Sequence, residues 1–298
     1  MAAEEEEEVQ HNFTAEDGTT LSLRTSCLRR NAALLSSQRD LTGMSHWRAG
    51  SLLASLLACR NSSVLRGSAV CELGCGASAL LASVAAAAGA SAVVATDGEA
   101  AALPLAARNA RRAAAGGGGC AVAALPLRWG APAADSAAAE AAVLGALGGA
   151  ADLLLAAEVL YHHRGGAEGW GVEEQGRALL ALAKRLLRPD GCLLLVYTPR
   201  YAGMAKGLRA AARGAGGVAL RTIARHAALT PQLAASQAFP DTRILAASPC
   251  AAALQRWITR LGSPPEAPPA DDSEGEEGGE EARGGHPLLA GVEGDLFA

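Results

Sequence analysis

Three features that the sequence lacks narrow the class of protein. No apolar run reaches about 18 residues without a charge or a break, which argues against a transmembrane helix. The first ten residues contain no basic side chain, and Glu4–Glu8 have the wrong sign for a secretory signal or a mitochondrial transit peptide. Aromatic residues make up only 3% of the 298 residues, and the abundant alanine favours helix while indicating little about function. We therefore expect a soluble protein of the cytoplasm or the nucleus, with no membrane partner.

The sequence also lacks a metal-binding motif. Its seven cysteines are scattered, and none forms a C-x-x-C pair. Cys71 and Cys75 bracket a strand end and a turn, but no second pair complements them as zinc ligands. His162 and His163 are adjacent, which is not the spacing of metal ligands. We predict reduced, buried thiols and no metal site.

The net charge of −4 hides an asymmetry along the chain. Residues 1–8 carry a net charge of −5 and residues 263–298 a net charge of −9, which leaves +10 on residues 9–262. A basic region of this kind suits a protein partner with an acidic surface, or less readily a nucleic acid. A solvated, arginine-rich surface explains the same asymmetry equally well.

Composition divides the chain into three parts. We predict a disordered acidic tail over residues 1–10 and a disordered acidic tail, rich in proline and glycine, over residues 263–298. The folded domain then covers residues 11–262. Within it, residues 11–26 alternate polar and apolar side chains around Asp17-Gly18, which predicts a β-hairpin.

From residue 68 onward, short apolar runs alternate with helical patterns. The runs 152–159 and 192–198 are nearly all apolar, as expected for strands buried on both faces of a parallel sheet, whereas the runs 218–224 and 243–248 alternate more. The pattern predicts an α/β fold with a Rossmann-like, seven-stranded, mostly parallel sheet, helices on both faces and a final antiparallel strand pair. The predicted strands are 69–73, 91–96, 120–129, 152–159, 192–198, 218–224 and 243–248, and the predicted helices are 41–58, 79–88, 100–115, 137–147, 173–187, 201–213 and 252–261.

A candidate ligand loop follows the first strand of this alternation. Gly74 and Gly76 allow a sharp turn and a close approach of the backbone to a ligand. Glu72 places a carboxylate at the end of the same strand, where it would repel a pyrophosphate and attract an ammonium group. Asp97 ends the next strand and suits hydrogen bonds to ribose hydroxyls. S-adenosylmethionine, which carries an ammonium, a sulfonium and a ribose, fits all three features.

A dinucleotide site is the main alternative at this loop. Gly74-x-Gly76-x-x-Ala79, followed by Asp97, formally satisfies the dinucleotide fingerprint. Against it stand the acidic Glu72, the alanine at the third glycine position, and the absence of a Tyr-x-x-x-Lys pair. The methyl donor is therefore the favoured ligand.

Five sequence blocks resemble the seven-strand methyltransferases, and within them methyltransferase family 16, which is rich in protein-lysine methyltransferases. The resemblance runs from about residue 40 to residue 200. The matching blocks are Thr42-Gly43-x-x-x-Trp47-x-Ala49-Gly50, Glu72-Leu-Gly-Cys-Gly76, Thr96-Asp97 with Leu103 and Arg108-Asn109, Leu127-Arg128-Trp129, and Asp152-Leu-Leu-Leu-Ala-Ala-Glu158-Val-Leu-Tyr161.

The resemblance implies a role for each matching residue. Trp47 would line the methionine end of S-adenosylmethionine, Trp129 would lie against its adenine, and Ala157 would contribute backbone near the methyl group. Glu72, Gly74 and Gly76 would cradle the cofactor, and Asp97 would hold its ribose. Glu158 and Tyr161 would face the substrate as catalytic residues. Two positions depart from the family pattern: Ser78 stands where glycine is usual, and Glu158 where aspartate is usual.

Several of these residues also have structural interpretations. Trp47 and Trp129 could equally be packing anchors, and Tyr161 a residue of the sheet rim. Asn109 is better explained as a packing or helix-end residue than as a ligand.

The sequence favours methylation of a protein lysine. Methylation of RNA or of a small molecule is the alternative, although no N/D-P-P-Y/F motif that would hold a base amino group is present. A non-catalytic binding module on the same fold is the third interpretation.

Overall fold

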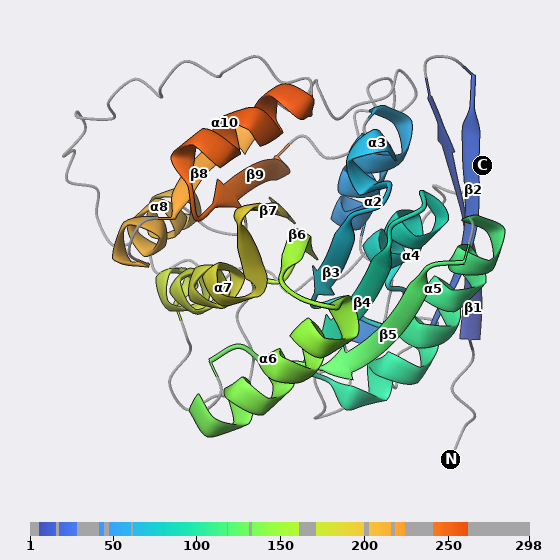
Figure 1. Ribbon diagram of the computed structural model, residues 1–298, viewed down its shortest axis with the longest axis horizontal. Helices are drawn as coiled ribbons and strands as arrows, with labels where there is room; N and C mark the ends of the chain where they lie inside the picture. The colour runs from blue at the N-terminus through green and yellow to red at the C-terminus, as the bar shows by residue number, and fades with distance from the viewer. Residues whose placement is uncertain are drawn as a thin grey trace, which may run out of the picture. The chain divides into compact units, whose positions relative to one another are not determined.

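The computed structural model describes residues 6–15, 18–28, 42–44, 48–60, 62–117, 119–130, 133–160, 171–199, 203–215, 218–223 and 241–261 (Figure 1). The strands are β1 Glu6–Thr14, β2 Thr20–Leu28, β3 Ala69–Leu73, β4 Ala92–Asp97, β5 Ala121–Pro126, β6 Ala151–Ala157, β7 Leu187–Tyr197, β8 Ala219–Ile223 and β9 Arg243–Ser248. The helices are η1 Thr42–Met44, α2 Arg48–Ser55, η2 Leu56–Arg60, α3 Ser62–Leu65, α4 Leu80–Ala87, η3 Ala100–Ala102, α5 Leu103–Gly117, α6 Ala133–Leu147, α7 Val172–Leu186, α8 Met204–Gly214 and α10 Ala251–Arg260.

Seven strands form the main sheet, in the order β5-β4-β3-β6-β7-β9-β8. The first five of these strands run parallel, and β9 is antiparallel to both of its neighbours. The predicted fold class is therefore confirmed, including the final antiparallel pair. The strand order reverses between β3 and β6, and in open α/β sheets ligands bind outside the carboxyl ends of the strands at such a point.

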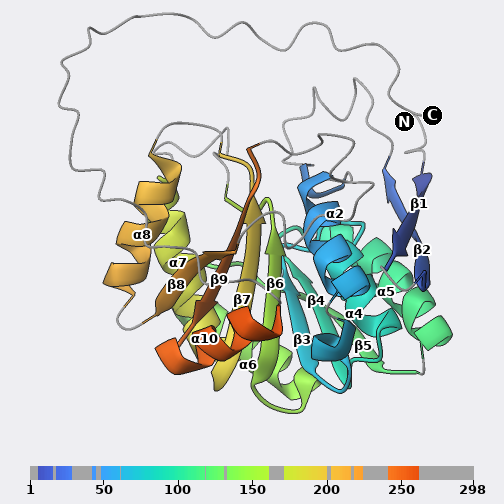
Figure 2. The same cartoon turned by 90° about the horizontal axis from the view of Figure 1, so that it is seen from above.

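Two apolar cores lie on opposite faces of the sheet, because successive side chains of a strand point to opposite sides. In β3, Val70 belongs to the core that includes side chains of α2, α4, α5 and α10, whereas Cys71 belongs to the core with α6, α7 and α8. All five residues of β3 are buried, as expected for a central strand. Figure 2 shows the strands side by side with helices around them.

Some predicted boundaries differ from the structure. The helix predicted over residues 41–58 is divided into η1, α2 and the π-helix η2. Pro189-Asp190-Gly191, predicted to close a helix, lies within β7, where the pairing with β6 shifts register. The third strand ends at Pro126 rather than at Trp129.

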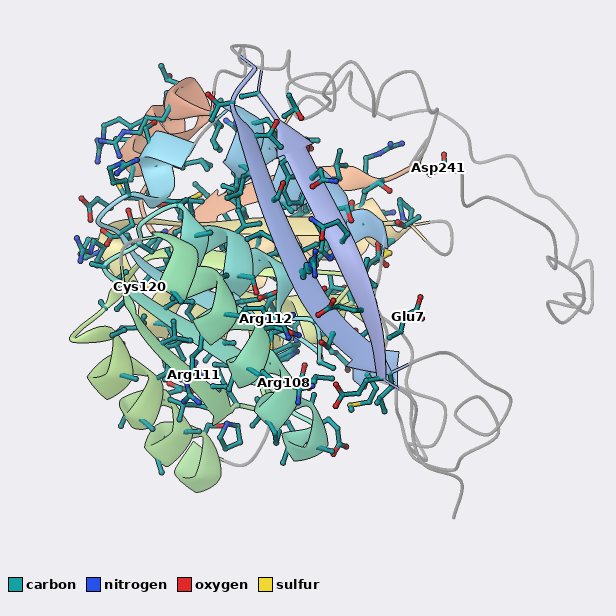
Figure 3. The ribbon with its side chains drawn as sticks, turned by 90° about the vertical axis from the view of Figure 1, so that its right-hand side faces the viewer. Glu7, Arg108, Arg111, Arg112, Cys120 and Asp241 are labelled. Carbon is teal, nitrogen blue, oxygen red and sulfur yellow. The ribbon has the colours of Figure 1, made fainter. Side chains whose placement is uncertain are left out.

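The N-terminal acidic segment requires a correction. Residues 6–10, predicted to be disordered, belong to β1, which pairs with β2 in the hairpin that the sequence predicted. Glu6 forms an ion pair with Arg108 of α5, and the Glu8 Oε1 and Arg112 Nη1 atoms are 2.6 Å apart. Figure 3 shows the hairpin beside α5. The cross-strand pairing and these arginines offset the repulsion among the glutamates, which composition alone does not reveal.

Two further predictions concern membrane-spanning helices and the ends of the chain. None of the helices in the described ranges is long and apolar enough to cross a membrane. The second predicted tail, residues 263–298, lies outside the described residues, as do residues 1–5.

Candidate functional site

A small pocket lies at the carboxyl ends of β3 and β6, next to the reversal of strand order. Its lining combines the loop after β3, the first turn of α4 and parts of η1 and α2. Glu72 is the only charged residue among the described residues that line it. The lining residues are Gly43, Gly50, Glu72, Gly74, Cys75, Gly76, Ser78, Leu80, Leu81 and Ala157.

The two glycines of the loop are required by local geometry. Gly74 and Gly76 have φ values of +66° and +54°, in the left-handed region that favours glycine. A Cβ atom at Gly76 would lie 2.3 Å from the carbonyl oxygen of Gly43, and one at Gly74 would lie 2.6 Å from Cγ1 of Val159. The loop can take this path only without side chains at these positions, which explains the G-x-G pattern.

The carboxylate of Glu72 is buried beneath the pocket. The residue is 4% exposed, and its Oε2 accepts a hydrogen bond of 2.7 Å from the main-chain N–H of Ala82, in the first turn of α4. Burial raises the pKa of Glu72 to about 8, and the nearby Asp97 carboxylate adds to this rise, whereas N–H groups of Ala82 and Leu81 oppose it. The structure thus gives Glu72 a place at the N-terminus of α4 as well as in the pocket wall.

Asp97 connects the end of β4 to the glycine loop. Its Oδ2 accepts a hydrogen bond from the Gly76 N–H, and its Oδ1 accepts one from the Glu99 N–H, both at 2.8 Å. Carboxylate oxygens accept hydrogen bonds, which is the property that suits them to ribose hydroxyls. The side chain is half-buried, beside the pocket-lining Gly76.

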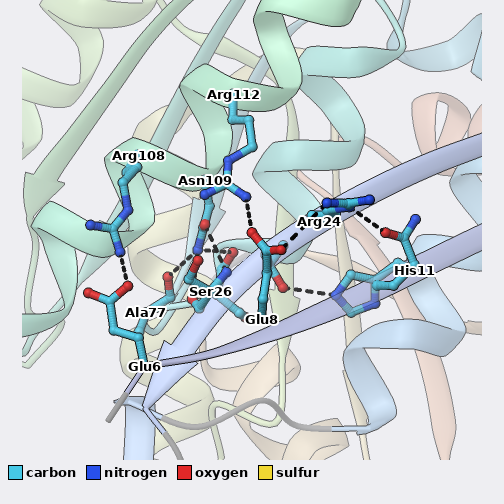
Figure 4. Close-up of polar contacts among 12 residues, drawn as sticks. Glu6, Glu8, His11, Arg24, Ser26, Ala77, Arg108, Asn109 and Arg112 are labelled. Atoms are coloured by element: carbon cyan, nitrogen blue, oxygen red, sulfur yellow. Dashed lines mark hydrogen bonds and ion pairs between the residues drawn. The ribbon is translucent and has the colours of Figure 1, made fainter. Parts of the chain in front are cut away.

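Asn109 of α5 holds the same loop from behind. Its Nδ2 donates hydrogen bonds to the carbonyl oxygens of Ala77 at 2.9 Å and Ser78 at 3.2 Å. The Ala77 N–H donates to the carbonyl oxygen of Gly43 at 2.7 Å. Asn109 is fully buried and also bonds to Ser26 of the hairpin, as Figure 4 shows. The sequence indicated a packing role for Asn109, but the contact with the loop could not be inferred from it.

A second polar group lies at the neighbouring strand end, immediately after β6. Glu158 has a φ of +56°, one of two positive values among the described non-glycine residues. Its Oε1 accepts a hydrogen bond of 2.7 Å from the hydroxyl of Thr198, which in turn lies 3.1 Å from the hydroxyl of Thr242. Sequence reasoning did not identify the two threonines, since they are distant in the chain and carry no motif.

The structure brings together part of the predicted site. Glu72, Gly74, Gly76 and Ala157 line the pocket, and Asp97 bonds to the Gly76 main chain. Trp129 lies close to Gly74, since Cη2 of its ring would be 3.3 Å from a Cβ atom there, and it packs against the core on the α6 side. Trp47 and Tyr161 fall outside the described residues, so their predicted roles stay predictions.

Comparison with known proteins gives matches among solved structures only. No protein-family model and no curated protein matches the chain. A candidate methyltransferase crystallised with SAH is 13% identical, with a TM-score of 0.48, over 83% of this chain and 57% of its own. A candidate SAM-dependent methyltransferase from Streptococcus mutans is 12% identical, with a TM-score of 0.49, over 80% of this chain and 55% of its own.

A third solved structure has a similar level of likeness. The SAM-dependent methyltransferase from Agrobacterium tumefaciens is 16% identical, with a TM-score of 0.46, over 81% of this chain and 70% of its own. The chain thus spans little more than half the length of the first two proteins.

Proposed function

We propose that this protein is an S-adenosylmethionine-dependent methyltransferase that binds its cofactor in the pocket at the carboxyl ends of β3 and β6. The supporting observation is the acidic group in the pocket wall: Glu72 is the only acidic or basic residue among the described residues that line it. An adjacent positive charge lowers the pKa of a carboxyl, so binding of S-adenosylmethionine would favour the ionised form of Glu72, which attracts the ammonium and the sulfonium. The pyrophosphate of a dinucleotide would gain no such attraction and would be repelled by the carboxylate. The carboxylate of Asp97 adds negative charge nearby and suits the ribose.

The polar groups and glycines in and beside the pocket match the functional groups of S-adenosylmethionine. Glu72 supplies the carboxylate for the ammonium, Asp97 the acceptors for the ribose hydroxyls, and Gly74 and Gly76 the close approach of the backbone. When bound, the cofactor supplies a methyl group on a sulfonium, which needs no further activation. The protein therefore contributes chiefly by positioning the acceptor and excluding water.

We further propose that the acceptor is a lysine side chain of a protein. A lysine amine has a pKa near 10.4 in water and has to lose a proton before it can accept a methyl group. Glu158 follows the pocket-lining Ala157, and its carboxylate can attract and orient the substrate ammonium. The positive sulfonium nearby would favour release of that proton to solvent. The resemblance to methyltransferase family 16 supports the same acceptor.

With Glu6–Glu8 counted in the folded part, residues 6–262 keep a net charge of +7 (+10 on residues 9–262 less the three glutamates), which favours a protein substrate with an acidic surface. Nucleic acid, a small molecule and a non-catalytic role are the competing outcomes of a direct test. The test incubates the protein with radiolabelled S-adenosylmethionine and a lysate of cells that express it. Label in a protein band, mapped to lysine by mass spectrometry, supports the proposal. Label removed by nuclease, or found only in small molecules, contradicts the protein acceptor.

Cofactor binding is tested separately by calorimetry with S-adenosylmethionine and with NAD. Binding of the first and not of the second is the expected result. Failure to bind S-adenosylmethionine, or tighter binding of NAD, would overturn the proposed cofactor.

A further inference from the structure

We propose that Thr198 and Thr242 are positioning residues that hold the Glu158 carboxylate in place for the acceptor amine, through a directional chain of hydrogen bonds. This inference rests on the methyltransferase function proposed above and deepens it on the substrate side.

Three strand ends meet at this point of the sheet. Glu158 follows β6, Thr198 follows β7, and Thr242 precedes β9. The pairing of Tyr197 with Arg243, at adjoining ends of β7 and β9, brings the two threonines together. The parallel pairing of β6 with β7 brings Thr198 to Glu158. The contacts span 40 residues between Glu158 and Thr198 and 44 residues between the threonines, so only the sheet creates this group.

The direction of the protons follows from the donor inventory. The Thr198 hydroxyl donates to Oε1 of Glu158 at 2.7 Å. A hydroxyl has one proton to donate, so in the 3.1 Å contact between the threonines Thr242 has to be the donor and Thr198 the acceptor. The chain therefore runs from Thr242 through Thr198 to the carboxylate. Each bond polarises the next, which strengthens the hydrogen bond to the charged group.

The backbone of Glu158 is fixed by a main-chain hydrogen bond, in addition to the hydrogen bond of its side chain. Its N–H donates to the carbonyl oxygen of Val196 at 2.9 Å, in continuation of the pairing between β6 and β7. Its φ of +56° is unfavourable for a residue with a Cβ atom, and such conformations persist where the surroundings impose them, often at functional sites. Thr242 is 1% exposed, so the far end of the chain of hydrogen bonds is shielded from water. A long, flexible glutamate is thus fixed at both ends.

The decisive experiment compares Thr198→Val with Thr198→Ser. Valine keeps the shape of threonine without the hydroxyl, whereas serine keeps the hydroxyl without the methyl group. We measure initial rates of label transfer from radiolabelled S-adenosylmethionine into the protein band of the lysate, at limiting and at saturating lysate. Calorimetry gives the cofactor affinity, and thermal unfolding gives the stability. Thr222→Val, at an exposed residue of β8, controls for the same chemical change elsewhere.

We expect Thr198→Val to lower the rate at saturating lysate by roughly tenfold or more, as for loss of a charge-assisted hydrogen bond. Cofactor affinity should stay within about twofold, and Thr198→Ser should restore the rate to within a few-fold of the wild type. A packing role would give the opposite order, with valine active and serine impaired, and that order would overturn the proposal.

Thr242→Val provides a second variant should Thr198→Val fail to fold. It should lower the rate less than Thr198→Val does, and the double variant should be no slower than Thr198→Val alone, because the second bond has no effect once the first is lost. Additive losses in the double variant, or a fully active Thr242→Val, would contradict the chain of hydrogen bonds. Absence of transfer by the wild type would refute the proposed function instead, which keeps the two failures distinct.

Discussion

Asn109 of α5 binds both main-chain polar groups of Ser26, a residue of the N-terminal hairpin that lies 83 positions earlier in the chain. Its Oδ1 accepts from the Ser26 N–H at 2.9 Å, and its Nδ2 donates to the Ser26 carbonyl oxygen at 2.8 Å. The same Nδ2 bonds to Ala77 and Ser78 of the glycine loop. One amide side chain therefore connects the hairpin to the wall of the proposed cofactor pocket.

Replacing Asn109 by alanine tests this connection. The change removes all four hydrogen bonds and leaves buried main-chain groups unsatisfied, so we expect the free energy of unfolding to fall by roughly 2 kcal/mol or more. Cofactor affinity should fall with it, because the loop loses its support. Chemical denaturation and calorimetry measure the two effects. Asn12→Ala, on the exposed side of the hairpin, is the matched control and should change both quantities little. Equal stability of the two variants would count against the role of Asn109.

Gly76→Ala isolates the close contact in the glycine loop. The added Cβ would lie 2.3 Å from the Gly43 carbonyl oxygen, in addition to the cost of a positive φ. Gly148 has a similar φ of +74° with open space around it, so Gly148→Ala carries the conformational cost alone. We expect Gly76→Ala to abolish measurable cofactor binding and Gly148→Ala to preserve it. Calorimetry measures the affinity of both variants for S-adenosylmethionine. Normal binding by Gly76→Ala would show that the close approach of Gly76 to Gly43 is not required.

Asp97→Ala is expected to weaken S-adenosylmethionine binding by roughly tenfold or more, through lost charge-assisted hydrogen bonds. The carboxylate both orders the loop, through Gly76, and offers acceptors for the ribose. Asp97→Asn keeps one acceptor oxygen and should lie between the wild type and the alanine variant. Calorimetry on the three proteins measures the series; an alanine variant with wild-type affinity would remove Asp97 from the site.

Glu72→Gln should reveal the raised pKa of that carboxyl through the pH dependence of stability. In the unfolded chain Glu72 ionises near 4.5, whereas burial raises its pKa to about 8 in the folded protein. Between these values the folded state holds a proton that the unfolded state has lost, so this group lowers stability progressively as the pH rises, and the full penalty is present above about 8. Without ligand, the melting temperature of Glu72→Gln should therefore exceed that of the wild type by more at pH 8.5 than at pH 5.

The same variant should bind S-adenosylmethionine at least about tenfold more weakly, because it lacks the charge that attracts the ammonium. Glu173→Gln, at an exposed residue of α7, controls for the general effect of the substitution. A stability difference that does not grow with pH would show that Glu72 is not protonated in the folded protein.

Glu158→Gln should abolish methyl transfer while cofactor affinity stays within a few-fold. The amide no longer attracts the substrate ammonium, and the pocket beside it is unchanged. Glu158→Gly should be equally inactive yet more stable than Glu158→Ala by about 1 kcal/mol, since both variants lose the acceptor for Thr198 and only glycine adopts a φ of +56° without strain. Label transfer and thermal unfolding measure the two effects. Normal turnover by Glu158→Gln would show that Glu158 is not a catalytic residue.

Much of the fold could be predicted from local patterns. The apolar run Ala69–Leu73 and the alternating run Arg243–Ser248 were predicted to the residue, because strand periodicity and flanking breakers are visible in a few consecutive residues. The hairpin was predicted for the same reason. Residues 6–10 were not, because a run of glutamates indicates disorder until the arginines of α5 are known to lie beside it.

The sequence by itself determined the parallel sheet, the glycine loop and the placing of Glu72 and Asp97 at strand ends, since these depend on neighbours within a few residues. Only the tertiary structure decided that Glu72 is buried against α4, that Asp97 bonds to the Gly76 main chain, and that Thr198 and Thr242 meet Glu158. Hydrogen bonds between distant residues depend on strand order and register. These are properties of the assembled sheet and leave no periodic trace in the chain.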